Sequence, residues 1–237
     1  MDLAIRFRAA VALVDRFPVL AGVDLDVRLG EIVLLQGANG AGKTSLLRAI
    51  AGLLRVTSGE AVVLGVDMLG DTRPLRRRVG LAGHTGALYD DLSVEDNVSF
   101  AVRASGHPRD RVAAALAQMG LTGRLPATPV GALSAGQRRR VALAILVARR
   151  PELWLLDEPH AGLDAEHRDL LDGIVRGAAA SGATVVLASH EHDRAHALAE
   201  RVVTLAGGVI ATSASASDAL SPAPSTLTIM GAAAHVA

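Results

Sequence analysis

Apolar and polar positions alternate along the chain with two distinct periods, which predicts strands and helices in turn. Residues 32–35 form a continuous apolar run, as in strands that are buried on both faces. After Lys43, the residues Leu46, Leu47 and Ile50 follow the spacing of one helix face. The same patterns predict further strands at 23–29, 61–64, 79–82, 153–156, 184–188, 202–205 and 209–210. They predict further helices at 94–104, 109–119, 135–149, 165–180 and 193–200.

This order of elements predicts an α/β fold. Strands that alternate with helices form a mainly parallel sheet with helices on both faces. Residues 84–150 interrupt the alternation because they are almost all helical, so we expect a helical subdomain inserted between core strands. Residues 1–211 are expected to form a single domain. Residues 212–237 are rich in Ala, Ser and Pro and lose periodicity, which predicts a weakly ordered tail.

Composition narrows the class of protein. Half of the 237 residues are hydrophobic but only 2% are aromatic, so the core must be built from Ala, Val and Leu. Lys plus Arg and Asp plus Glu both number 24, and the net charge of zero gives no electrostatic reason to expect nucleic acid as a partner. The chain has no cysteine, which excludes disulfides and thiolate metal sites and fits a reducing compartment.

The features of exported and membrane-spanning chains are also missing from the sequence. The first residues do not combine a basic start with an apolar run, as signal peptides do. The apolar runs at 141–148 and 202–206 are far shorter than the roughly 20 residues needed to cross a bilayer. We therefore predict a soluble chain in the cytoplasm, for which another polypeptide would provide any membrane-spanning part.

A glycine-rich segment between the strand at 32–35 and the following helix has the pattern of a phosphate-binding loop. Its glycines let backbone N–H groups turn inward around phosphate oxygens, and the helix start adds its positive dipole end. We expect Lys43 to reach the β- and γ-phosphates of ATP and Thr44 to offer its hydroxyl to Mg²⁺. The alternative, a glycine-rich turn without a ligand, is disfavoured by a full match in the right context. The predicted ATP-binding residues here are Gly37, Ala38, Asn39, Gly40, Ala41, Gly42, Lys43, Thr44 and Ser45.

Two acids follow the apolar strand at 153–156. Ligands of open α/β sheets bind beyond the carboxyl ends of the strands, so we expect Asp157 to hold Mg²⁺, usually through water. Glu158 would point the other way along the pleat and take the proton of the attacking water. The alternative is a solvated strand end with a helix-capping acid. The phosphate loop upstream favours the catalytic interpretation.

With these motifs together, the chain resembles the ATP-binding cassette (ABC) ATPases over residues 3–211. The most specific element is Leu133-Ser134-Ala135-Gly136-Gln137, which matches the family signature and opens a helix. The resemblance implies a phosphate-loop ATPase core with an antiparallel β N-terminal subdomain. It also implies a head-to-tail pair of cassettes. Ser134 and the Gly136 N–H would then contact the γ-phosphate held by the second copy.

Three further segments carry family features. Ala161-Gly162-Leu163-Asp164 resembles the loop that links the two sites across the dimer, with Asp164 as its last residue. His190 follows the strand at 184–188 and resembles the switch histidine. That resemblance implies a neutral imidazole that donates to the γ-phosphate and orients Glu158 and the water. For Arg138-Arg139-Arg140 a phosphate clamp is conceivable, and we favour a solvated helix face.

The sequence departs from the family at two positions. The family usually carries a glutamine that reaches the Mg²⁺ site and senses the membrane partner, and this chain has His84 there. A histidine could accept a hydrogen bond from water, but its charge varies near neutral pH. The family usually stacks adenine on an aromatic residue well upstream of the phosphate loop. Phe17 is the nearest aromatic residue, and core packing is an equal alternative for it.

The segments Gly83-His84 and 92–97 resemble the ATP-binding subunit of the haem exporter of cytochrome c maturation. This resemblance implies a homodimer at the cytoplasmic face of the inner membrane, docked to an integral membrane subunit. The first alternative is the ATPase of a drug, lipid or polysaccharide exporter. A soluble ABC protein acting on DNA or ribosomes fits less well, because a second cassette, a coiled-coil insertion and a basic linker are lacking. Binding without turnover is disfavoured by the intact catalytic motifs.

Overall fold

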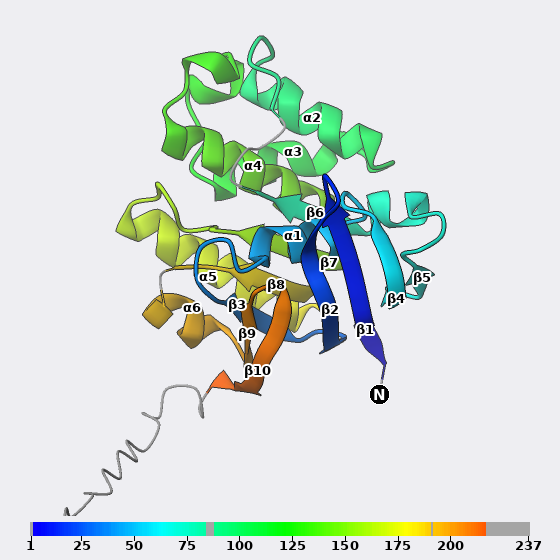
Figure 1. The fold of residues 1–237 in the computed structure, drawn as a ribbon. Helices are drawn as coiled ribbons and strands as arrows, with labels where there is room; N and C mark the ends of the chain where they lie inside the picture. Colours follow the sequence, from blue (N-terminus) through cyan, green and yellow to red (C-terminus); the bar gives the residue numbers. More distant parts are fainter. Residues whose placement is uncertain (1, 84–87, 191, 217–237) are drawn as a thin grey trace, which may run out of the picture.

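The computed structural model describes residues 2–83, 88–190 and 192–216, and its centre is a sheet of six strands (Figure 1). The strand order is β10-β9-β3-β8-β7-β6. All neighbours are parallel except β9 and β10, which form an antiparallel hairpin. The predicted mainly parallel sheet is therefore confirmed. The strands are β3 (Ile32–Gln36), β6 (Val79–Ala82), β7 (Leu153–Asp157), β8 (Thr184–Ala188), β9 (Arg201–Ala206) and β10 (Val209–Ser215).

A second, antiparallel sheet has the order β2-β1-β4-β5 and confirms the β subdomain that the family resemblance implied. Its strands are β1 (Leu3–Val14), β2 (Phe17–Arg28), β4 (Val56–Val63) and β5 (Val66–Asp67). The hydrophobic pattern did not identify β1. The reason is a bulge at Ala9, where φ is 45° and the register with β2 shifts. Phe7 faces the core before the bulge and Ala10 after it, so the alternation changes phase within the strand.

Six α-helices are present in the described ranges: α1 (Lys43–Ile50), α2 (Val94–Ala104), α3 (Val112–Gln118), α4 (Ala135–Arg149), α5 (Ala165–Ala180) and α6 (His192–Leu198). The helices α2, α3 and α4 follow β6 and precede β7 in the chain, and they gather at one end of the molecule (Figure 1). The expected helical insertion is confirmed. None of the helices in the described part of the chain has both the length and the hydropathy needed to span a bilayer.

Two hydrophobic clusters lie on opposite faces of the central sheet. Val33 and Leu35 of β3 face a cluster that contains α1 and the antiparallel sheet. Ile32 and Leu34 face the other cluster, which contains residues of α5 and of the helical subdomain. All four side chains are at most 5% exposed, as expected for a strand covered on both faces. The helix α1 is therefore packed between the two sheets, and its first turn lies at the carboxyl end of β3.

The last described strand is longer than the sequence pattern suggested. Thr212 pairs with Thr204 and Ser213 pairs with Val203, so β10 runs through the boundary that we placed before residue 212. That boundary is wrong, because small polar residues such as Ser and Thr form strands when a neighbouring strand supplies the hydrogen bonds.

Candidate functional site

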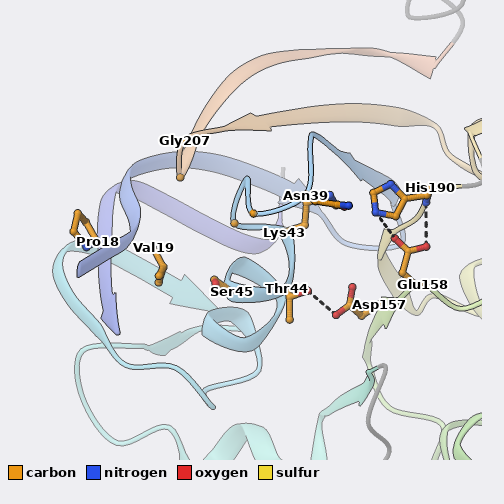
Figure 2. Close-up of a pocket in the computed structure, with 13 residues that line it drawn as sticks. Pro18, Val19, Asn39, Lys43, Thr44, Ser45, Asp157, Glu158, His190 and Gly207 are labelled. Carbon is orange, nitrogen blue, oxygen red and sulfur yellow. Dashed lines mark hydrogen bonds and ion pairs between the residues drawn. The ribbon is translucent and has the colours of Figure 1, made fainter. Parts of the chain in front are cut away.

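A cavity of about 470 Å³ opens at the carboxyl end of the central sheet. The phosphate loop, the two predicted acids and His190 all contribute to its wall (Figure 2). The structure thus brings together residues that are more than 100 positions apart in sequence. Its lining residues are Pro18, Val19, Asn39, Gly40, Gly42, Lys43, Thr44, Ser45, Asp157, Glu158, His190, Gly207 and Gly208.

The phosphate loop is held in a path that only glycine can follow at two points. Gly37 has a φ of 143°, and a Cβ there would lie 2.3 Å from the carbonyl oxygen of Leu205. Gly42 has a φ of 108° and is the N-cap of α1, with the Val19 carbonyl oxygen 3.0 Å from its hypothetical Cβ. Larger residues would be strained in this conformation and would collide with neighbouring backbone.

The turn between β9 and β10 packs against the same loop. The Gly208 N–H donates to the carbonyl of Ala41 at 3.1 Å, and the Ala21 N–H donates to the carbonyl of Gly208 at 2.9 Å. The hairpin therefore connects the loop to the antiparallel sheet. Sequence reasoning missed Gly207 and Gly208 as lining residues, because hairpin glycines carry no local sign of what they pack against.

Lys43 is the first residue of α1, and its side chain curls back over the loop. Its Nζ donates to the carbonyls of Gly37 at 2.7 Å and Ala38 at 3.1 Å, and the residue is 7% exposed. The first N–H groups of a helix have no partner within it, and the first residues of α1 line the cavity. A buried cation and a helix start therefore face one space, which suits a phosphate group.

Thr44 and Asp157 meet at the other side of the loop. The Thr44 hydroxyl donates to Oδ2 of Asp157 at 2.8 Å (Figure 2), and Asp157 is 7% exposed. A hydroxyl and a carboxylate side by side are the oxygen donors that Mg²⁺ accepts when phosphate and water complete its shell. These two residues therefore fit the predicted metal site.

Glu158 and His190 form a pair at the edge of the cavity. The carboxylate accepts the His190 backbone N–H at 3.0 Å, and the ring Nε2 lies 3.4 Å from Oε1 (Figure 2). The alternation argument assumed that Glu158 continues the pleat of β7. In the structure it does not. It follows the last residue of β7 with a φ of 50°, and its N–H donates to the carbonyl of Ala188 at 2.8 Å. This turn directs the carboxylate into the cavity.

The signature segment lies apart from this cavity. Within the described residues, none of Leu133, Ser134, Ala135, Gly136 and Gln137 lines it. Ser134 caps α4 in a complete capping box, because its hydroxyl accepts the Gln137 N–H and the Gln137 side chain accepts the Ser134 N–H. A Cβ on Gly136 would lie 2.6 Å from the carbonyl oxygen of Gly162. The signature and the predicted dimer loop are thus in direct backbone contact.

Asp164 ends that loop as the N-cap of α5. Its carboxylate accepts the His167 N–H at 2.9 Å and lies 2.6 Å from the ring Nδ1 of His167. These hydrogen bonds from His167, the backbone one first, lower the pKa of Asp164. The N-cap hydrogen bond joins the end of the loop to the first turn of α5.

The two remaining candidate residues are Phe17 and His84. Phe17 is 74% exposed, so core packing is wrong for it, and it is absent from the described lining of the cavity. The next two residues, Pro18 and Val19, line that wall instead. His84 lies outside the described residues.

The three arginines after the signature do not form a solvated helix face. Arg139 is 8% exposed and donates to backbone carbonyls at the ends of β6 and β7. Sequence reasoning missed this role, because a run of three arginines has no internal feature that distinguishes the buried one. Its position opposite the ends of two parallel strands, where carbonyls lack ladder partners, becomes visible only in three dimensions.

The sequence and the fold were compared with those of known proteins, and both are similar to ATP-binding subunits of transporters. The family described as ABC transporter matches residues 20–161. The cytochrome c biogenesis ATP-binding export protein CcmA of Bordetella bronchiseptica is 42% identical over 184 residues, covering 77% of this chain and 82% of the relative. The lactose transport ATP-binding protein LacK of Rhizobium radiobacter is 38% identical over 197 residues, covering 81% of this chain and 54% of the relative.

This chain therefore spans about half the length of LacK and most of the length of CcmA. Among solved structures, the ATP-binding subunit of an ABC transporter superposes with a TM-score of 0.84 at 25% identity, and 91% of each chain is covered.

Proposed function

This chain belongs to the ABC transporter family, and on that premise we propose that it is a subunit that binds and hydrolyses ATP as one half of a dimer. The observation that carries this proposal is the shared cavity. The phosphate loop, Asp157, Glu158 and His190 line one space of about 470 Å³. Each of them supplies a group that phosphoryl transfer to water requires.

Phosphate binding is the task of the loop and the start of α1. In the described state, the Lys43 ammonium is bonded to the Gly37 and Ala38 carbonyls. The β- and γ-phosphates are stronger acceptors, because they carry charge, and they replace those carbonyls when ATP binds. The N–H groups of the loop and of the first helical turn then surround the phosphate oxygens.

The pair of Thr44 and Asp157 is proposed to hold Mg²⁺. When bound, this ion supplies positive charge next to the phosphates. The hydroxyl oxygen of Thr44 would hold the ion directly, and the carboxylate of Asp157 would hold it through water.

Glu158 is proposed as the general base, the residue that accepts the proton of the attacking water. The His190 backbone N–H fixes one carboxylate oxygen at 3.0 Å, and the ring Nε2 lies 3.4 Å from the other. In this arrangement His190 orients Glu158 and stands beside the position of the γ-phosphate. A general base of this kind contributes about 10²–10⁴-fold to the rate.

A second copy is proposed to complete the site. The signature segment does not line the cavity of its own chain in the described residues, although Ser134 is exposed at a helix start. Head-to-tail pairing would place Ser134 and the Gly136 N–H of one chain over the γ-phosphate bound to the other. Asp164 and its loop would then lie between the two sites.

A membrane subunit is the further partner that we propose, with this chain peripheral at the cytoplasmic face. A groove of about 590 Å³ between α1 and α4 supports this role. Leu53 and Leu88 give it an apolar wall, and Leu53 is 71% exposed. The groove reaches Thr44 and Asp157, so a helix docked there would contact the proposed metal site.

For the cargo, we propose the haem exporter of cytochrome c biogenesis. The Gly83-His84 pair and the 42% identity to CcmA support it. The 38% identity to LacK keeps an ATPase for another substrate as the alternative. Co-purification from membranes tests the choice. An integral subunit of the cytochrome maturation type supports the proposal, and a sugar, drug or lipid transporter subunit contradicts it.

The enzymatic proposal is tested with Glu158→Gln. The amide keeps the size of the side chain but cannot take a proton, so ATP binding should remain and steady-state hydrolysis should fall by about 10²–10⁴-fold. ATP should also trap the dimer, which size-exclusion chromatography detects. The matched control is Glu152→Gln, a surface acid paired with Arg78. Unchanged hydrolysis in Glu158→Gln would remove Glu158 from its role as base.

A further inference from the structure

Three consecutive arginines at the start of α4 point to three different environments. Arg138 is bonded to the exposed Asp90 at 2.7 Å. Arg140 lies 2.8 Å from the ring Nε2 of His167. Arg139 points inward and is 8% exposed. The buried arginine is therefore the exception in this run.

The guanidinium of Arg139 binds the carbonyl ends of two parallel strands. Nη1 donates to Gly83, which follows β6, at 2.5 Å. Nη2 donates to the carbonyls of Asp157 and Glu158, at 2.5 Å each. Nε lies 3.4 Å from the carbonyl oxygen of Pro159. All of these acceptors are backbone atoms, so the side chain holds the main chain at the two acids and joins it to the end of β6.

Arginine is suited to this place for chemical reasons. Its planar group has five N–H donors and no acceptor, and it keeps its charge throughout the physiological pH range. Burial lowers the pKa of Arg139, and the charges of Asp157 and Glu158 act in the opposite direction. A lysine at the same position would present a single nitrogen, which cannot reach carbonyls that are spread over two strands.

The contact with Glu158 concerns a strained part of the backbone. Glu158 has a φ of 50°, a conformation that residues other than glycine rarely adopt. Its N–H is held by the carbonyl of Ala188 and its carbonyl by Arg139, so both ends of this residue are fixed. The direction of the Glu158 carboxylate depends on that backbone. If one of these two hydrogen bonds were lost, the backbone of Glu158 could relax to a less strained conformation.

We propose that Arg139 is a positioning residue, which sets the direction of the Glu158 carboxylate in its own chain by holding the backbone that follows β7. The same side chain joins that backbone to α4, the helix that Ser134 caps. The proposal rests on the proposed ATPase function. It also replaces the phosphate-clamp interpretation, in which an arginine of this run would bind phosphate.

The first experiment compares Arg139→Gln and Arg139→Lys with Arg138→Gln as matched control. Dissociation constants for ADP, kcat and KM for ATP, and Tm are measured for each. We expect Arg139→Gln to keep the ADP constant within about twofold and to lose about tenfold or more in kcat, because a shift of about 1 Å at a reacting group can reduce the rate by about 10². Arg139→Lys should recover part of kcat, and Arg138→Gln should match the wild type.

Several outcomes would overturn the proposal. One is wild-type kcat in Arg139→Gln. Another is a parallel loss of ADP binding and Tm in both Arg139 variants, which would indicate a role in folding alone. A wild-type chain without ATPase activity would contradict the proposed function instead, so the two failures are distinguishable.

Mixed dimers separate an effect on the same chain from an effect on the partner. Suppose that Arg139 acts on Glu158 of its own chain. A mixed dimer with Arg139→Gln and Glu158→Gln in the same chain should then be as active as a mixed dimer with Glu158→Gln alone in one chain. The same two substitutions in different chains should reduce activity by a further tenfold or so. The reverse order of activities would assign Arg139 to the nucleotide of the partner and overturn the proposal.

Discussion

Two helices of this molecule, α1 and α4, begin at segments that are proposed to contact phosphate, but their first turns are built differently. The N-cap of α1 is Gly42, with left-handed backbone and no side-chain hydrogen bond. The N-cap of α4 is Ser134, which forms a complete capping box with Gln137. One helix start is left open toward a cavity, and the other is closed by its own side chains.

The difference separates two ways of binding the same group. An uncapped start has free N–H groups that need an anion or water, so α1 is a receptor whose partner is the ligand. A capped start is ordered without ligand, and the Ser134 hydroxyl keeps its proton for donation to another group. We infer that the phosphate loop captures nucleotide and that the signature responds to nucleotide already held by the other chain.

The largest effect should follow from changing the open start. Lys43→Ala removes the buried cation of the loop, and hydrogen bonds from a charged group contribute about 1.5–3 kcal/mol each. We expect ATP affinity to fall by about 10- to 150-fold, as measured by equilibrium binding. Tm without nucleotide should also fall, because the Gly37 and Ala38 carbonyls lose a buried donor, so affinity is measured at a temperature at which the variant is folded. Wild-type affinity would remove Lys43 from the nucleotide site.

A smaller effect, confined to turnover, is expected at the closed start. Gly136→Ala would place a Cβ 2.6 Å from the Gly162 carbonyl and push the dimer loop away. We predict that hydrolysis falls by about tenfold or more, since misplacement by about 1 Å can reduce rates by about 10². ADP binding to the single chain should be retained. The control is Gly177→Ala in α5, where a Cβ meets nothing within 4 Å. Equal loss of binding and turnover would argue against a separate role for the signature.

The smallest loss of hydrolysis is expected for Ser134→Gly, which largely preserves the helix cap. Ser134→Gly removes the hydroxyl, but glycine is also a favoured N-cap residue. The free energy of unfolding should therefore fall by only about a few tenths of a kcal/mol. Tm should therefore stay near that of the wild type, and hydrolysis should fall by several fold. Ser134→Asp also caps well and adds a negative charge, so it should abolish the ATP-dependent dimer at unchanged Tm. Dimerisation of Ser134→Asp to the wild-type extent would place Ser134 away from any phosphate.

The residues that the sequence predicted best are those whose role is local. The spacing of Gly37, Lys43 and Thr44 predicts a phosphate loop, because the strand, turn and helix that form it are continuous in sequence. The pair Asp157 and Glu158 follows the same logic at the end of β7. The cavity residues Gly207 and Gly208 could not be predicted, since only the folding of a distant hairpin brings them to the loop.

Two failures have more specific physical causes. Phe17 was given core packing as its alternative role because it is aromatic, but it lies at the first position of β2, next to the turn at 15–16, and the residue is 74% exposed. Arg139 belongs to a polar run that helical periodicity assigns to solvent. The carbonyls of Gly83 and Asp157 reverse that preference because they accept hydrogen bonds from Arg139, and a buried acceptor without a partner would cost about 1–3 kcal/mol.

The hairpin that supports the phosphate loop has a consequence for the order in which the protein is made. Gly208 donates to Ala41, and the Leu205 carbonyl fills the space in which a Gly37 side chain would lie. Residues 37–44 leave the ribosome long before residue 208. We therefore infer that during synthesis the loop is without these contacts until the hairpin has formed.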